Sequence, residues 1–110
     1  MTNIKEIPYY YSMWQIMLEN ERAGFHFFSP DTMRFFKSRV SKVIYQGDGG
    51  IYFITSEQYD YKSPRHFTVR QFNPETKNIE TIGKFNELTS YQAHKLAKEM
   101  SRTKGENQDE

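Results

Sequence analysis

The stretch IYFITSEQYDYKSPRHFTVRQF, residues 51–72, contains the two strongest strand patterns in this sequence. Residues 51–59 and 65–72 are rich in β-branched and aromatic side chains, which favour an extended backbone. The connection between them is short, and short connections join antiparallel neighbours. We therefore expect these two segments to pair as an antiparallel hairpin.

Two further strand patterns flank this hairpin, over residues 40–46 and 78–85. The turn QGDGG (46–50) offers glycines that tolerate positive φ, and NPETKN (73–78) is a short turn that contains proline. The sequence thus predicts a four-stranded antiparallel meander over residues 40–85, with a three-stranded sheet as the alternative.

A first helix is predicted over residues 9–22. Tyr10, Met13 and Met17 fall on one stripe at helical spacing. Gly24 follows as the expected C-terminal cap, because glycine tolerates the left-handed conformation that commonly ends a helix.

A second helix is predicted over residues 29–39. Ser29 is a typical N-cap, Pro30 suits the first helical position, and Asp31 complements the positive end of the helix dipole. Three apolar residues at helical spacing would seal the sheet: Met33, Phe36 and Val40.

A third helix is predicted over residues 89–101, where Thr89 and Gln92 form a capping-box pattern. Its apolar face would consist of Ala93, Leu96, Ala97 and Met100. Residues 102–110 are polar and are expected to form a disordered tail. Residues 1–100 thus predict a single α+β domain, in the order α-α-β-β-β-β-α, with the helices packed on one face of the sheet.

Composition restricts the class of protein. The chain has 110 residues and no cysteine, which excludes disulfides, thiolate metal sites and a cysteine nucleophile. Aromatic residues are 16% of the total and supply much of the expected core. A formal net charge of +1 gives no global field towards nucleic acid or membrane. No signal peptide or bilayer-spanning run is visible, so we expect a soluble, intracellular protein.

Motifs for catalysis are missing from the sequence. The three histidines, His26, His66 and His94, fall in no metal-binding or catalytic pattern. No serine lies in G-x-S-x-G, and GDGG (47–50) lacks the lysine of a phosphate loop. We therefore expect no catalytic residue, metal or cofactor. A small enzyme stays open as an alternative, because catalytic groups can assemble from distant positions.

Positive charge is concentrated in the middle of the chain, where residues 34–70 hold seven basic side chains against three acidic ones. Six of these are candidates for binding an acidic protein surface or an RNA: Arg34, Lys37, Arg39, Lys42, Arg65 and Arg70. The alternative is that they form an ordinary solvated surface.

A second candidate surface lies in YYYSMWQIM, residues 9–17. Tyrosine and tryptophan anchor many interfaces, because each offers a large area for little rotamer entropy. The candidates here are Tyr9, Tyr11 and Trp14. The alternative is that this helix packs in the core.

The segment IGKFNELTSYQAHKLAKEM (82–100), with the strands before it, resembles the sheet-plus-helix modules of the plant ethylene-response DNA-binding domain and of integrase arm-binding domains. The match consists of a G-x-F step at Gly83 and Phe85 and small residues at Ala93 and Ala97. The resemblance implies a free sheet face that enters the major groove. Here that face would offer His66, Thr68, Arg70 and Lys84. A sheet-based DNA-binding module or regulator is therefore an alternative function.

Three further segments together resemble a set of short uncharacterised proteins encoded by phages, plasmids and other mobile elements: FFSPDTMRFFKSR (27–39), YFITSEQ (52–58) and PRHFTVRQF with IETIGKF (64–85). The resemblance implies an accessory protein in the cytoplasm of a bacterial host cell. Our leading expectation is a non-enzymatic interaction protein, such as an anti-CRISPR inhibitor of a bacterial defence nuclease. Its partner would be a host protein, such as a CRISPR effector nuclease or its guide RNA complex, with nucleic acid as a further partner and no membrane.

Overall fold

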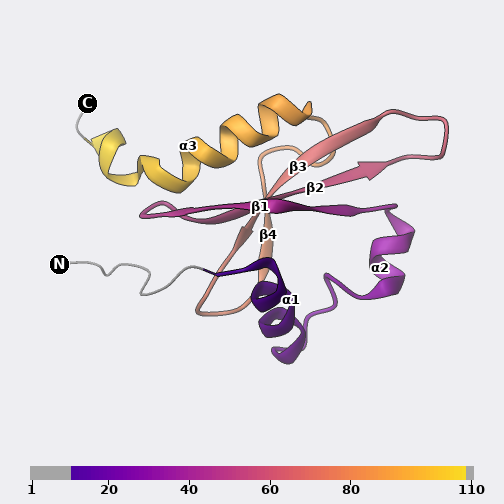
Figure 1. Cartoon of the computed structure of the whole chain (residues 1–110), viewed down its shortest axis with the longest axis horizontal. Coiled ribbons are helices and arrows are strands. Elements are labelled where there is room, and N and C mark those ends of the chain that lie inside the picture. Colours follow the sequence, from indigo (N-terminus) through magenta and orange to yellow (C-terminus); the bar gives the residue numbers. More distant parts are fainter. Residues whose placement is uncertain (1–10, 109–110) are drawn as a thin grey trace.

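A four-stranded antiparallel sheet forms the middle layer of the molecule (Figure 1). The computed structural model describes the backbone of residues 11–108 and the side chains of residues 11–102. The elements along the chain are α1 (Met13–Arg22), α2 (Pro30–Phe35), β1 (Arg39–Gly47), β2 (Gly50–Gln58), β3 (Arg65–Phe72), β4 (Ile79–Ile82) and α3 (Ser90–Gln108). The strands lie in the order β1-β2-β3-β4, which confirms the predicted α+β meander with four strands.

The ladder between β2 and β3 determines which side chains share a face of the sheet. It runs from Ile51 to Gln58 of β2 without a shift in register. Because successive strand residues point to opposite faces, Ile51 and Phe53 lie on one face, and Tyr52 and Ile54 lie on the other. Every side chain of β2 except the first and last is buried, so both faces are covered.

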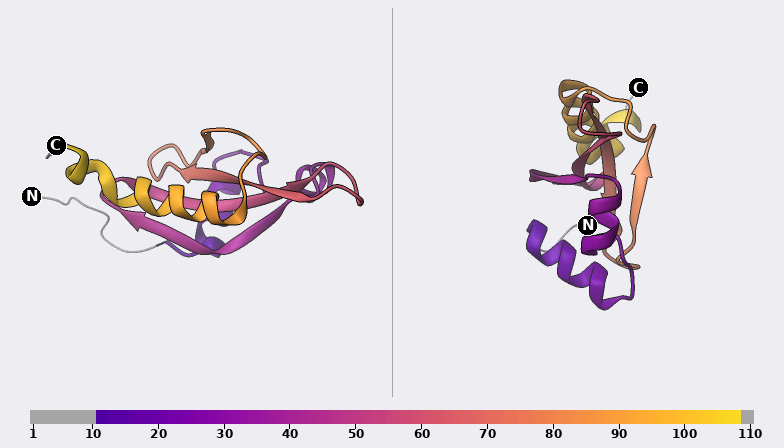
Figure 2. Two further views of the ribbon diagram at one scale, coloured as in Figure 1. Left: turned by 90° about the horizontal axis from the view of Figure 1, so that it is seen from above. Right: turned by 90° about the vertical axis from the view of Figure 1, so that its right-hand side faces the viewer.

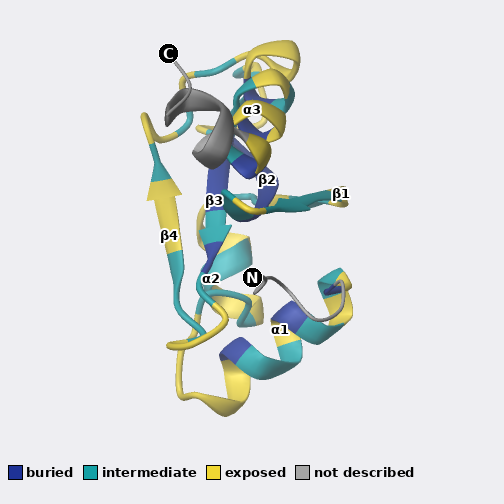
Figure 3. Ribbon diagram, turned by 90° about the vertical axis from the view of Figure 1, so that its left-hand side faces the viewer, coloured by how far each residue is buried: buried dark blue, intermediate teal, exposed yellow. Residues whose placement is uncertain are grey.

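The first face is covered by α1 and by the segment that follows it. The buried cluster on this side consists of Tyr11, Ile16, Ile51, Phe53 and Phe72. Phe27 and Phe28 pack against this cluster, and both rings contact Phe53, with centroids 6.3 and 6.0 Å away. Figure 3 shows the resulting buried band, which follows β2 and β3 between α1 and α3.

The second face is covered by α3, whose small residues Ala93 and Ala97 allow close approach to the sheet. They pack with Tyr52, Ile54 and Val69. The expectation that the helices share one face is therefore wrong, since α1 and α3 lie on opposite sides of the strands (Figure 2). The physical reason is the pattern of β2, which is apolar at both odd and even positions and needs cover on both sides.

Helix α1 begins later than predicted, because Ser12 is its N-cap and accepts a backbone N–H of the first turn at 3.1 Å. This start places Ile16 and Asn20 on the buried side. Met13 packs against the buried cluster on this side, but Met17 is exposed, so the predicted stripe is wrong at Met17. Tyr10, the first member of that stripe, lies outside the described residues.

Helix α2 begins as predicted, with Ser29 as N-cap and Pro30 in the first turn. It ends at Phe35 rather than at residue 39, and none of its residues is buried. Val40 belongs to β1, and Phe36 is 41% exposed. The predicted seal over the sheet is therefore wrong, because fewer than two helical turns cannot present three residues at that spacing.

Helix α3 begins with the predicted capping box. The Thr89 N–H donates to Gln92 Oε1 at 3.0 Å, and the Gln92 N–H donates to Thr89 Oγ1 at 3.1 Å. The helix continues through Gln108, so the prediction of a disordered tail over 102–110 is wrong as far as Gln108. Four of the residues in this extension have high helix propensity: Arg102, Lys104, Glu106 and Gln108. No helix in the described part of the chain is long and apolar enough to cross a membrane.

Strand β1 is irregular between Val40 and Ile44. Three of its residues lie there opposite a single residue of β2, Ile54. The Ser41 hydroxyl accepts the Ile54 N–H at 3.3 Å, and Lys42 is exposed. The insertion is a β-bulge, which bends a strand and increases its twist.

Candidate functional site

A shallow pocket of ≈ 430 Å³ lies at the end of the sheet where α2 and the β2–β3 hairpin meet. Its lining residues come from α2, the turn after it, β1, the hairpin and β3: Met33, Arg34, Lys37, Ser38, Arg39, Tyr61 and Arg65. We refer to this set as the basic pocket. It brings together four of the six predicted basic residues, and in the described part of the chain no carboxylate is among the lining residues.

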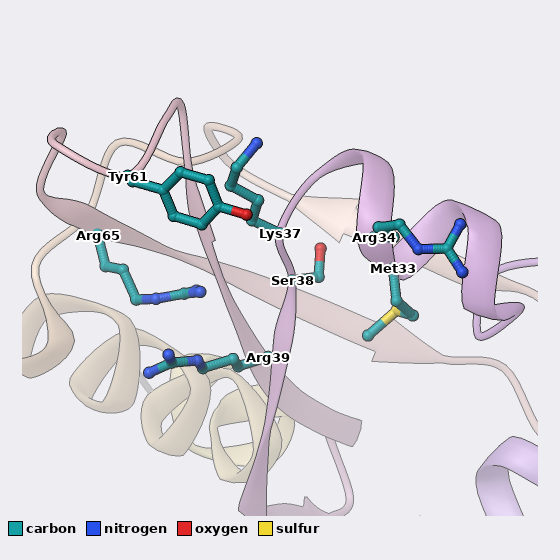
Figure 4. A pocket seen from close by; sticks show the side chains of 7 residues that line it. All are labelled: Met33, Arg34, Lys37, Ser38, Arg39, Tyr61 and Arg65. Atoms are coloured by element: carbon teal, nitrogen blue, oxygen red, sulfur yellow. The ribbon is translucent and has the colours of Figure 1, made fainter.

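Strand register brings two of the guanidinium groups together. Arg39 pairs with Ser56 and Arg65 pairs with Gln58, two positions further along β2, so both arginines lie on the same face. Figure 4 shows the two side chains extending beside each other. Arg65 is held by two hydrogen bonds, because its Nη1 donates to the carbonyl and to the hydroxyl of Ser56, each at 2.9 Å.

The like charge of these two groups is only partly offset. Burial lowers the pKa of Arg65 most, the neighbouring charge of Arg39 lowers it further, and Glu57 raises it. Two guanidinium groups that repel each other at one site would be relieved by a bound anion.

Lys37 sits in an unusual backbone conformation, with φ of 50°. Its N–H donates to the Arg34 carbonyl at 3.1 Å, and the Ser38 N–H donates to the Met33 carbonyl at 2.8 Å. This pattern is a Schellman motif, in which the left-handed position usually belongs to glycine. The Lys37 ammonium lies 5.4 Å from the ring centroid of Tyr61, within range of a cation–π interaction.

The β2–β3 hairpin that carries Tyr61 is ordered by Asp60. Its Oδ1 accepts hydrogen bonds from the Lys62 N–H, the Ser63 N–H and the Ser63 hydroxyl, each at 2.9 Å. The Ser63 side-chain bond is the main cause that lowers the pKa of Asp60. The turn leaves Tyr59 and Tyr61 on the outside, 86% and 88% exposed.

Arg34 contributes least to the basic pocket. It is exposed and forms an ion pair with exposed Asp31 at 3.0 Å. Figure 4 shows its side chain turned away from the other three cations. Exposed pairs of this kind contribute little energy, so Arg34 stays free to exchange partners.

One protein family matches this chain. A family of unknown function, DUF7447, matches residues 12–99. The chain belongs to this family. The match includes every residue of the basic pocket and ends within α3. No curated protein and no solved structure matches the chain.

Arg70 has a structural place in this DUF7447 chain, and its prediction as a binding residue is wrong. It is 9% exposed and pairs with buried Glu57 at 3.2 Å. Its guanidinium lies between the rings of Phe27 and Phe85, 5.0 and 5.3 Å from their centroids. Burial lowers the pKa of Arg70, and the charge of Glu57 opposes this effect.

Threonine hydroxyls complete the hydrogen bonding of this buried pair. Arg70 donates to Thr55 at 3.0 Å and to Thr81 at 2.6 Å, and Thr68 donates to Glu57 Oε1 at 3.0 Å. The pair is thus satisfied inside the fold. The sheet face expected to be free for DNA is occupied at Thr68 and Arg70, both of which are buried.

The residues of the predicted aromatic surface at α1 do not lie on one exposed surface. Tyr11 is buried, with its ring centroid 5.3 Å from that of Phe72, so its prediction as an exposed anchor is wrong. Trp14 is 71% exposed but does not line the basic pocket. Tyr9 lies outside the described residues. Lys42 is exposed in the β1 bulge, away from the pocket lining.

Sequence reasoning missed Tyr61, Ser38 and Met33. The signal for Tyr61 is the pair of tyrosines that flank Asp60 between two strong strands, where side chains are expected to face solvent. Within the described residues, no group of three His, Cys, Asp or Glu side chains could hold a metal ion. The arrangement in the basic pocket is suited to holding an anion.

Proposed function

We propose that this chain is a small non-enzymatic interaction protein that binds a polyanionic partner through the basic pocket. The observation that carries the proposal is the convergence of Lys37 and Arg39, on the stretch that leads from α2 into β1, with Arg65 on β3. Asp60 lies near enough to Lys37, and Glu57 to Arg65, to offset part of the repulsion among these cations. An anionic ligand would remove the repulsion that remains.

The strained backbone of Lys37 supports the same function. A non-glycine residue in the left-handed region costs about 1–2 kcal/mol. Strained residues of this kind cluster at active sites and ligand-binding sites. Gly24 fills the equivalent position after α1, with φ of 98°, whereas Lys77 and Asn86 also have positive φ and do not line the pocket, so the conformation of Lys37 supports the proposal only together with its place there.

The setting of this function follows from the resemblance to proteins of mobile elements. The partner would belong to a bacterial host cell, where nucleases and their guide RNA complexes expose the phosphates that the basic pocket suits. An inhibitor of anti-CRISPR type would act by covering such a surface. Capture from host extract, before and after nuclease treatment, reports whether the partner is protein, nucleic acid or both.

The direct test uses immobilised heparin as a polyanion. The variant Arg39→Glu with Arg65→Glu changes two charges inside the basic pocket. Its matched control, Lys42→Glu with Lys84→Glu, makes the same change in net charge at two exposed lysines outside the pocket. We expect the pocket variant to elute at clearly lower salt than the control.

Equal elution of the two variants would show that only net charge matters and would overturn the proposal. Thermal unfolding of both variants checks that each is folded. If the double variant unfolds, Arg39→Glu alone serves instead, because Arg39 is exposed.

A further inference from the structure

We infer that the basic pocket binds single-stranded nucleic acid, with an unpaired base stacked on Tyr61 and the adjoining phosphates on Arg39 and Arg65. This inference rests on the proposed function and names the class of partner. It is carried by exposed aromatic side chains that accompany the cations.

Large aromatic side chains gather at this end of the molecule without cover. Tyr61 is 88% exposed and lines the pocket, and Tyr59 is 86% exposed on the same hairpin. Phe35 is 77% exposed and stands next to Arg34, a lining residue on α2. Each ring presents apolar area to water, and clusters of such area mark binding surfaces.

The ring of Tyr61 has one face occupied by a cation. The Lys37 ammonium lies over the ring, and the high exposure of Tyr61 leaves the remaining ring surface open to solvent. A nucleobase stacked on that open surface gains energy from the aromatic contact. The Lys37 charge stays near the phosphates on either side of the base.

The exposed ring of Tyr61 favours a polyanion that can stack on it, which separates single-stranded nucleic acid from the other classes. In a duplex the bases stack on one another, so their faces are closed to a protein side chain. An acidic protein surface would neutralise Arg39 and Arg65, but its carboxylates do not stack on Tyr61. Single strands supply both phosphates and open base faces, which is how aromatic and basic grooves bind them without sequence preference.

The test measures fluorescence anisotropy of labelled strands of about 12 nucleotides, a length within the range that small single-strand binders cover. The probes are a single-stranded DNA, a single-stranded RNA of the same sequence, and the corresponding DNA duplex. We expect at least one single strand to bind more tightly than the duplex. Binding of both single strands, or of RNA alone through its 2′-hydroxyl, supports the inference.

Two pairs of variants locate the contact. Tyr61→Leu removes the ring at an exposed position and should weaken binding about fivefold or more, as loss of one stacked base does. Its matched control is Tyr91→Leu, at a tyrosine of α3 that is 74% exposed and does not line the pocket, and it should leave affinity unchanged. Arg39→Gln should reduce the salt dependence by about 0.7 in the log–log slope, the value for one lost phosphate contact, whereas Lys84→Gln should not.

The outcomes separate the two proposals. If pocket-dependent binding to heparin is found but the duplex binds as tightly as the single strands, or Tyr61→Leu binds like Tyr91→Leu, this inference is wrong and the proposed function stands. If neither heparin nor any strand depends on the basic pocket, both are wrong.

Discussion

Lys37 occupies a backbone position that glycine would fill at lower energy. Replacing it by glycine should raise the free energy of unfolding by about 1 kcal/mol, because the left-handed conformation then loses its steric strain. The same change should weaken binding to heparin. Urea denaturation measures the first effect and salt elution the second.

Lys42→Gly, within β1, is the control for this prediction. It should change stability by less than about 1 kcal/mol, because Lys42 lies in the β-bulge, where glycine is tolerated, and it should leave heparin binding nearly unchanged. A loss of stability in Lys37→Gly would mean that contacts of the side chain outweigh the strain of the backbone.

Arg70 and Glu57 form a buried ion pair whose members depend on each other. Arg70→Met should destabilise the fold by about 3–5 kcal/mol, because it leaves the Glu57 carboxylate buried without its counter-charge. The double variant Glu57→Gln with Arg70→Met should lose less than the sum of the two single variants. Denaturant unfolding of all three gives the coupling energy.

Arg65→Met is the matched control for the buried pair. It removes a less buried arginine of the same strand and should cost much less stability. A similar loss in both arginine variants would contradict the assignment of Arg70 to the fold and Arg65 to the site.

Asp60 provides a prediction about pH. Hydrogen bonds, chiefly from the Ser63 hydroxyl, hold its pKa below the ordinary value of 3.8. A carboxyl with a lowered pKa stabilises the folded hairpin above that ordinary value, and the contribution is lost as the pH falls through the lowered value. In an NMR titration, Ser63→Ala should move the Asp60 pKa upward; an unchanged pKa would exclude the hydroxyl as the main cause.

At the scale of the elements, local signals in the sequence were sufficient where capping and turn chemistry act alone. β3 spans residues 65–72 as predicted, and the capping residues Ser29, Thr89 and Gln92 make the expected hydrogen bonds. The start of α1 was predicted too early, because the aromatic residues before Ser12 were assigned to the helix and Ser12 was not recognised as its N-cap. This error in the helix boundary led to a wrong set of buried residues for α1, which are Ile16 and Asn20 in the structure.

The β1–β2 turn and α3 are in contact at the backbone. The Gly49 N–H donates to the Ser101 carbonyl at 2.8 Å, and a Cβ on Gly49 would overlap the Met100 carbonyl oxygen. Gly49→Ala should therefore displace α3 and destabilise the fold by about 1–3 kcal/mol, the usual range for overpacking. Hydrogen exchange should show reduced protection in α3.

Asp48→Ala, at the exposed neighbouring position of the same turn, is the control for Gly49→Ala. It should leave both stability and exchange nearly unchanged. Equal effects of the two alanine variants would point to the turn conformation and not to the contact with α3.

At the scale of the whole molecule, the candidate site lies at one end of the sheet because both faces are filled by the two cores. The sequence indicated the basic residues but could not show which of them meet. Strand periodicity could have separated two of them. Arg65 and Arg70 are an odd number of residues apart, so they point to opposite faces of β3. The contact between the Lys37 ammonium and the Tyr61 ring joins the turn after α2 to the β2–β3 hairpin. These two segments are distant in the sequence, so no local pattern predicts the contact.

Trp14 is the only tryptophan of the chain and reports on a region outside the basic pocket. Its fluorescence should be quenched by iodide in the folded protein, because the side chain is 71% exposed. Saturation with a single-stranded oligonucleotide should leave this quenching unchanged. Protection of Trp14 would show that α1 belongs to the interface, as the aromatic pattern of residues 9–17 suggested.

The bulge in β1 also bears on self-association. An outer strand with a regular ladder offers its free N–H and C=O groups to a second copy, which is the usual start of fibril growth. Here the three residues between Val40 and Ile44 break the spacing of those groups, and Lys42 places a charge where a neighbouring strand would dock. The opposite outer strand, β4, has only four residues. The bulge, the charge of Lys42 and the shortness of β4 together protect this open sheet from edge-to-edge pairing with a second copy at high concentration.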